Sequence, residues 1–259
     1  MADSSKSRDT VARTLVMAVL TSLVCSALVT SVAISLKPAQ ERNELRNRQQ
    51  NILAVVGLLE AEGTIEEKFE NIETRVVELS SGDYADDIDP DQFDPISAAL
   101  NSDTGIAIEP EVDVANLKRR ANHARVYLVK QDGDVVNIIL PVRGAGLWST
   151  MYGFIALQPD GNTIRGLKFY EHGETPGLGD QIDRPAWLAQ WEGKLVYGDS
   201  GAPAVEVVRG QAPEGSPHQV DGMSGATLTG NGVNGLLQYW LGDDGFGPYL
   251  EKHWSTDRG

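Results

Sequence analysis

One long apolar run near the start of the chain dominates its hydropathy pattern, and shorter apolar segments separated by turn residues follow much later. Residues Thr14 to Leu36 carry no charged side chain over 23 positions. As a helix this run is roughly 35 Å long, against a hydrocarbon core of about 30 Å. A cleaved signal peptide has an apolar stretch of only about 7–15 residues. The run therefore predicts a single transmembrane helix over residues 14–36, after a short N-terminal tail over residues 1–13.

Residues 37–123 predict a helical connector followed by an acidic loop region. The stretch from Lys37 to Gly63 is expected to continue as a helix, and Thr64 with Glu67 forms a capping box that opens a second one. Apolar residues then recur at helical spacing up to Leu79, which predicts an amphipathic helix packed on a core. Residues 80–113 are acidic and lack periodicity. Their aspartates lack the glycine and terminal glutamate of a calcium loop, so we expect a solvated loop and no metal site.

From residue 124 onward the pattern changes to strands, which predicts a second domain over residues 124–259. Two pairs of strand-like segments, 126–129 with 135–142 and 147–157 with 163–170, each flank a turn containing an Asp-Gly pair. A helix is expected around residues 184–191, a strand over 204–209 and a final helix after Thr227. The order predicts an α+β fold: one N-terminal transmembrane helix, then a domain with an antiparallel sheet flanked by helices.

Composition narrows the classes of function. The net charge is −15, which repels nucleic acid and anionic lipid, so neither is an expected partner. With Cys25 as the only cysteine, no intrachain disulfide or cysteine-based metal site can form. Intramembrane ionisable residues mark ion pathways, and the apolar run has none, so this chain does not move ions by itself. Basic residues flank both ends of the run almost equally, so charge does not decide its orientation.

The stretch from Asp221 to Thr227 carries the first candidate site. A small-residue turn there leads directly into the predicted final helix, whose unpaired backbone N–H groups and dipole favour a phosphate. Gly225 and Ala226 allow close approach to the backbone, and Thr227 offers an oxygen that could bond to phosphorus. The alternative is a helix N-cap, in which Ser224 or Thr227 serves a single backbone donor.

A second candidate stretch runs from Glu171 to Gly179. It ends a predicted strand with a Pro-Gly turn, a shape that lets backbone amides face a flat ligand. Leu178 could cover one face of such a ligand, while backbone groups from Thr175 to Gly179 meet its polar edge. The alternative is a tight connection between a strand and a helix.

Two other motifs fail on context. Gly230 to Gly235 matches G-x-G-x-x-G, but no strand precedes it and only 24 residues follow, so a dinucleotide fold is excluded. Gly222 to Ala226 misses the nucleophile-elbow pattern at its last position. The histidines show no metal-binding spacing, and no catalytic side chain is expected.

The two candidate stretches together resemble a known family. His-x-Glu-Thr-Pro-Gly-Leu-Gly at 172–179, followed by Ser-Gly-Ala-Thr at 224–227, is similar to the paired motifs of the FMN-binding domain family. That family includes the FMN-binding subunits of two respiratory complexes, the sodium-translocating NADH:quinone oxidoreductase and its Rnf relatives. Residues 37–40, 49–53 and 143–153 look like the longer subunit of the sodium pump, and the resemblance covers essentially the whole chain.

The resemblance implies a covalently flavinylated electron-carrier subunit, whose FMN is joined by a phosphoester to Thr227. It implies no catalytic centre apart from that FMN, which passes electrons between neighbouring subunits toward ubiquinone. A separate flavin transferase attaches the FMN, and the soluble domain is periplasmic on the bacterial inner membrane, with a cytoplasmic tail. The alternatives are an Rnf-type electron transport protein and a non-redox membrane-anchored assembly module. The residues expected to bind FMN are Ser224, Gly225, Ala226, Leu228, Thr229, Trp148, Glu174, Thr175, Gly177, Leu178 and Gly179.

Overall fold

The computed structural model describes residues 11–254, so most of the predicted N-terminal tail lies outside the described residues. The chain divides into two units, residues 1–48 and residues 49–259. The helices and strands, in chain order, are α1 Val11–Val55, α2 Ile65–Phe69, β1 Ile72–Glu78, α3 Pro95–Leu100, β2 Gly105–Ala107, β3 Arg119–Ala121, β4 His123–Gln131, β5 Asp134–Ala145, β6 Thr150–Leu157, β7 Ile164–Glu171, the 3-10 helix η1 Gly179–Asp183, α4 Pro185–Leu188, the 3-10 helix η2 Ala189–Trp191, β8 Glu206–Val207, β9 Gln219–Val220, α5 Thr227–Leu241 and α6 Gly247–Trp254.

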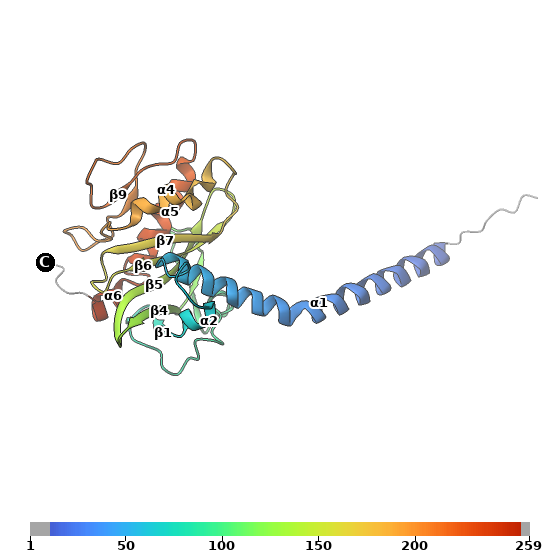
Figure 1. Ribbon diagram of the computed structural model, residues 1–259. Helices are drawn as coiled ribbons and strands as arrows, with labels where there is room; N and C mark the ends of the chain where they lie inside the picture. Colours follow the sequence, from blue (N-terminus) through green and yellow to red (C-terminus); the bar gives the residue numbers. More distant parts are fainter. Residues whose placement is uncertain (1–10, 255–259) are drawn as a thin grey trace, which may run out of the picture. The chain divides into compact units, whose positions relative to one another are not determined.

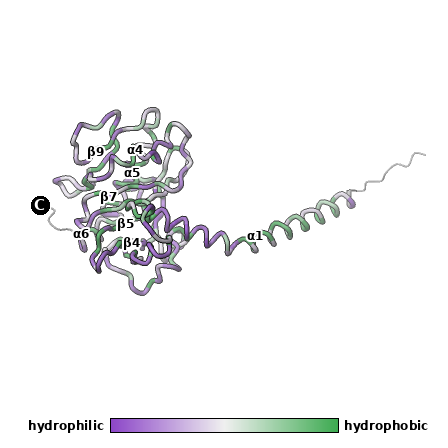
Figure 2. The backbone as a smooth tube through the Cα atoms, viewed as in Figure 1, coloured by the Kyte–Doolittle hydropathy of each residue, from purple (hydrophilic) through white to green (hydrophobic). Residues whose placement is uncertain are grey.

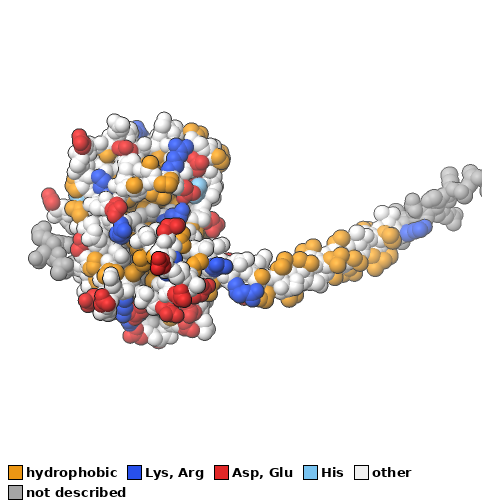
Figure 3. Space-filling model, in the orientation of Figure 1, with side chains coloured by type: hydrophobic (Ala, Val, Ile, Leu, Met, Phe, Trp, Pro, Cys, Tyr) orange, Lys and Arg blue, Asp and Glu red, His pale blue; other side chains and the backbone are white. Residues whose placement is uncertain are grey.

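Helix α1 contains the predicted transmembrane run. It is long and apolar enough to cross a membrane, and its most apolar window has no side chain buried by the rest of the protein. Figure 2 shows the apolar part of α1 giving way to a hydrophilic part further along the helix. The same apolar side chains are visible along the N-terminal part of α1 in the space-filling view (Figure 3). An unburied apolar surface of this size needs an apolar solvent, as the sequence predicted.

A five-stranded antiparallel sheet forms the centre of the second unit, in the order β1-β4-β5-β6-β7 (Figure 1). Both predicted hairpins are present, β4 with β5 and β6 with β7. Asp132 and Gly133 have φ values of 52° and 94° at the first turn, the conformation that a tight hairpin turn requires. The antiparallel sheet flanked by helices confirms the predicted α+β class.

Helices cover both faces of this sheet. Val126, Leu128 and Leu140 point to one face, where they share a core with Leu236 and Leu237 of α5. Alternate residues point to the other face, where Tyr127 and Ile139 pack with Ile52 and Leu53 at the end of α1. Because both faces are buried, these strands are almost continuously apolar, without the alternation of a half-exposed strand.

The predicted amphipathic helix over residues 64–79 is wrong beyond its first turn. The capping box of Thr64 and Glu67 is present, but α2 ends at Phe69. Residues 72–78 form strand β1, which pairs with β4 along its whole length. Lys130 of β4 bonds Glu73 at 2.5 Å, and this hydrogen bond holds the pKa of Glu73 below its usual range. The strand conformation is favoured here because pairing at the sheet edge buries apolar residues that a helix over residues 64–79 would leave half exposed.

The compact unit begins at Gln49 and so takes in most of the segment expected to be a connector. The compact unit starts before residue 124 because the edge strand of its sheet, β1, lies before that residue. The acidic region contains α3 and β2, and β2 pairs with β3. A short parallel pair, β8 with β9, lies between α4 and α5 in sequence and brings residues 206–207 beside residues 219–220. That pair positions the loops around the start of α5.

Candidate functional site

The start of α5 carries no side-chain cap. The helix begins at Thr227, and its N-cap residue is Ala226, whose methyl group cannot accept a hydrogen bond. The alternative in which Ser224 or Thr227 caps the helix is therefore wrong. An uncapped start leaves backbone N–H groups of the first turn available to a ligand. Thr227 is exposed at this point, with its hydroxyl on the first residue of the helix.

The turn before α5 contacts the Glu174–Gly179 loop. Gly225 has a φ of 75°, and a Cβ on it would lie 3.0 Å from Cδ2 of Leu178. The side-chain amide of Gln181 donates to the carbonyl oxygens of Leu178, at 2.8 Å, and of Ser224, at 3.2 Å. The structure thus brings together the two motifs, whose separation in sequence gives no direct evidence of contact.

Glu174 is the centre of a buried hydrogen-bond network. Its side chain is only 5% exposed. One carboxylate oxygen accepts from the backbone N–H of Leu147 at 2.8 Å and of Trp148 at 3.3 Å. The other accepts from the hydroxyl of Thr229. A buried carboxylate is costly unless hydrogen-bonded, so these three donors stabilise it and bind three segments into one unit.

Glycines allow this network to close. A Cβ on Gly179 would lie 2.8 Å from Oε2 of Glu174, and one on Gly146 would lie 2.4 Å from Oε1. Both distances are too short for a real side chain, so only glycine permits the carboxylate to sit between these backbones. Gly179 was also predicted to bind the ligand. Its contact with Glu174 does not test that prediction.

His172 supports the same loop and was not predicted. Its Nδ1 accepts from the backbone N–H of Glu174 at 3.2 Å, and its Nε2 lies 2.7 Å from a carboxylate oxygen of Asp183. An accepting Nδ1 requires the proton on Nε2, which then donates to Asp183. The sequence signal for this role was the position of His172 two residues before Glu174, because a turn can bring a side chain to the backbone N–H two residues later.

Four large apolar side chains near the site are exposed: Leu147, Trp148, Leu178 and Leu228, with 44%, 69%, 45% and 60% of their surface accessible. The indole N–H of Trp148 donates to the hydroxyl of Thr175 at 2.9 Å, which orients the ring. Gly177 has a φ of 80° in the turn between Thr175 and Leu178, and its N–H donates to Asp180. Exposed aromatic and aliphatic groups of this kind suit the faces of a flat ring system.

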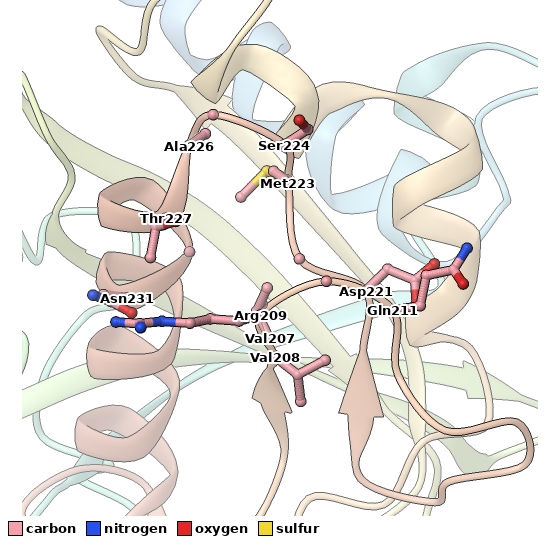
Figure 4. Close-up of a pocket in the computed structure, with 14 residues that line it drawn as sticks. Val207, Val208, Arg209, Gln211, Asp221, Met223, Ser224, Ala226, Thr227 and Asn231 are labelled. Atoms are coloured by element: carbon pink, nitrogen blue, oxygen red, sulfur yellow. The ribbon is translucent and has the colours of Figure 1, made fainter.

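A cavity of about 500 Å³ is lined by Thr227 and by the turn before it. Figure 4 shows Arg209 reaching from the segment after β8 across to α5, where Asn231 and Thr227 lie. None of Trp148, Glu174 and Leu178 lines this cavity, whereas Gly225, which lies beside Leu178, does. The residues lining the cavity are Val207, Val208, Arg209, Gly210, Gln211, Asp221, Gly222, Met223, Ser224, Gly225, Ala226, Thr227, Gly230 and Asn231.

The cavity is of a size that suits an organic cofactor, because ligand pockets commonly measure about 300–1,000 Å³. An uncapped helix start, an exposed hydroxyl and apolar side chains for a ring complete the features that a flavin phosphate needs. The fold and the site define an FMN-binding domain, and residues 146–242 match the family model described as "FMN-binding domain".

The whole chain is similar to the NqrC subunits of Na(+)-translocating NADH-quinone reductases. The Yersinia pestis protein is 46% identical over 255 residues, with 96% of each chain covered. The Pseudomonas aeruginosa protein is 45% identical, covering 94% of this chain and 96% of that one. The crystal structure of Shewanella oneidensis NqrC is 38% identical and superposes with a TM-score of 0.75, covering 83% of this chain and 98% of that one. The chain belongs to the NqrC family.

Two features of the site were missed by sequence reasoning. Arg209 and Gln211 lie in a segment with no motif, and only the β8–β9 pairing brings them to the start of α5. Asn231 lies within the G-x-G-x-x-G motif, which was rejected as a dinucleotide site. It lines the cavity one turn after Thr227.

Proposed function

We propose that this chain is the electron-carrier subunit of a sodium-translocating NADH:quinone reductase, and that its FMN is joined through a phosphoester to Oγ1 of Thr227. The single observation that carries the proposal is the start of α5. There an exposed threonine hydroxyl opens a helix whose N-cap, Ala226, has no capping side chain, beside a cavity of about 500 Å³.

Electrostatics at the start of α5 favour such a bond. Esterification converts a phosphate monoester that is close to dianionic into a diester with a single negative charge. The backbone N–H groups of Thr227, Leu228 and Thr229 lie in the first turn, where the helix dipole is positive. They would stabilise the remaining charge of the diester.

The exposed apolar side chains around the site would hold the flavin ring. Trp148 is oriented by its bond to Thr175, and Leu178 is held beside Gly225. FMN supplies the redox chemistry when bound, while these residues determine its position and burial. Because all four apolar groups are partly open to solvent, we expect one edge of the ring to stay accessible for electron transfer with neighbouring subunits.

Attachment needs a separate flavin transferase with FAD as donor. Ser224, Gly225, Thr227 and Leu228 are all exposed, so a second protein can reach the hydroxyl of Thr227 in the folded domain. We propose further that α1 crosses the bacterial inner membrane once and that the FMN-binding domain is periplasmic.

Co-expression of the full chain with the transferase tests the phosphoester. Wild-type protein should give a fluorescent band on a denaturing gel and an intact mass raised by one FMN less one water. Thr227→Ala should give neither, whereas Ser102→Ala, which removes an exposed hydroxyl outside both motifs and the cavity, should keep both. Thr227→Ser should keep part of the flavin, because a hydroxyl remains. A fluorescent Thr227→Ala band would refute the assignment.

The position of the ring has its own test. Stacking on an indole quenches flavin fluorescence, so Trp148→Leu should increase the fluorescence of the folded, flavinylated protein several-fold without changing its flavin content. Trp191→Phe is the control, because Trp191 is fully buried and lies in the main core. Equal fluorescence in wild type and Trp148→Leu would place the ring elsewhere.

A further inference from the structure

Arg209 is an exposed arginine in the lining of the cavity at the start of α5. It follows β8, lines the cavity beside Thr227, and Figure 4 shows its side chain reaching across to α5 near Asn231. Neither the sequence motifs nor the names of the NqrC relatives assign it a role. Its position follows from the parallel pairing of β8 with β9, which places residues 206–207 beside the strand that leads into the Asp221–Thr227 turn.

The positive charge of Arg209 is not balanced by a carboxylate partner within the described residues. Across residues 11–254, none of the ion pairs or side-chain hydrogen bonds of the structure includes the Arg209 guanidinium. The other ionisable residue that lines the cavity is Asp221, whose carboxylate accepts from the backbone N–H of Ala212 at 2.8 Å. In a chain of net charge −15, carboxylates are the abundant groups. An exposed arginine that pairs with none of them, at the rim of a cavity, is available to an anionic ligand.

The donors that converge on the cavity indicate which anion fits. A guanidinium presents its N–H groups as a planar fork that matches two oxygens of a phosphate. Asn231 adds a side-chain amide one turn after Thr227, and Arg209, Asn231 and Thr227 all line the same cavity. A phosphate attached to Thr227 therefore has a cationic group and an amide available in that cavity, besides the uncapped start of α5.

We propose that Arg209 is the cationic partner of the flavin phosphate, with Asn231 as a second donor, and that this pair draws the phosphate and ribityl chain toward the cavity. The inference rests on the proposed function for the identity of the ligand. It assigns a positioning role: Arg209 fixes the phosphate and so the direction in which the ring leaves Thr227. It forms and breaks no covalent bond.

Binding of free flavins to the full chain in detergent, expressed without the transferase, is the first test. Riboflavin lacks the phosphate, so wild-type protein should bind FMN about tenfold more tightly than riboflavin. Arg209→Gln should bring this ratio close to one, and Arg209→Lys should restore part of it, since a lysine keeps the charge but not the fork. Arg165→Gln is the matched control, because Arg165 is a surface residue paired with Glu192. An FMN preference unchanged in Arg209→Gln would overturn the proposal.

The flavinylated protein provides the second test. The ³¹P resonance of its phosphodiester should shift in Arg209→Gln and not in Arg165→Gln, and flavin fluorescence anisotropy should fall in the first variant alone. If free flavins do not bind measurably, the phosphorus resonance decides: an unshifted signal in Arg209→Gln would overturn the role of Arg209. A wild-type protein without covalent flavin would instead contradict the Thr227 phosphoester, while an FMN preference that depends on Arg209 would still support this inference.

Discussion

Two surfaces meet at the turn before α5, and they differ in how far their polar groups are hydrogen-bonded within the protein. On one side, the Glu174–Gly179 loop is tied by hydrogen bonds to the 146–148 turn and to α5, around a carboxylate that is 5% exposed. On the other side, the segment after β8 lines a cavity, and its Arg209 has no ion pair within residues 11–254. The buried carboxylate of the first surface is fully hydrogen-bonded within the protein, whereas the Arg209 guanidinium of the second has no such partner among the described residues.

The difference separates two requirements of a carrier domain. A cofactor must be held in one place, which needs rigid backbone supported by buried, fully bonded groups. It must also be bound, which needs donors that no protein group already occupies. The Glu174 network meets the first requirement, and the cavity beside Arg209 meets the second. Substitutions that remove one property and keep the other test this division.

The largest effect is expected at Glu174. Glu174→Ala removes the acceptor of two backbone N–H groups and of the Thr229 hydroxyl, and each unsatisfied buried group costs about 1–3 kcal/mol. We expect the free energy of unfolding of the compact unit to fall by about 3 kcal/mol, measured as a lower urea midpoint of the detergent-solubilised chain. Glu171→Ala removes an exposed carboxylate three residues earlier and should change the midpoint little. Equal midpoints for the two variants would show that the network does not support the fold.

Thr227 and Thr229 offer a sharper comparison within one helix turn. Thr229→Val leaves the buried Glu174 without its hydroxyl donor and should cost about 1–2 kcal/mol, while the flavin attachment residue is intact. Thr227→Val changes an exposed residue, so its cost should stay within about 0.5 kcal/mol, but covalent flavin should be lost. Urea unfolding and intact mass are measured on both variants. Flavin loss from Thr229→Val in protein that remains folded would contradict the division.

The smallest difference between two paired variants is expected at the contact between the two motifs. Gly225→Ala and Gly177→Ala both place a side chain at a positive φ, 75° and 80°, which costs about 1–2 kcal/mol in either case. A Cβ on Gly177 meets nothing within 4 Å, whereas one on Gly225 lies 3.0 Å from Cδ2 of Leu178. The stabilities should therefore be alike, and only Gly225→Ala should displace Leu178 and shift the flavin absorption maximum. Identical spectra would mean that Leu178 does not contact the ring.

Much of the fold follows from local pattern. Turn chemistry at Asp132 and Gly133 predicted the first hairpin, and helices were expected around residues 184–191 and after Thr227, where α4 and α5 are found. The helix prediction for residues 72–78 was wrong because the spacing of Ile72, Val76 and Leu79 fits an amphipathic helix equally well. Whether such a segment becomes a helix or an edge strand depends on β4, more than forty residues later, and no local pattern contains that partner.

The sequence by itself determined the apolar anchor, the two hairpins with the helices that follow them, and the two motifs, because each depends on neighbours within a few residues. It placed Thr227 at the start of a helix and Glu174 in a loop. Only the tertiary structure decided that Glu174 is buried under Thr229, and that Arg209 lies beside the same helix start. Those contacts join segments brought together by the sheet and by the β8–β9 pair. Close backbone packing at Gly146 and Gly179 makes room for the Glu174 carboxylate.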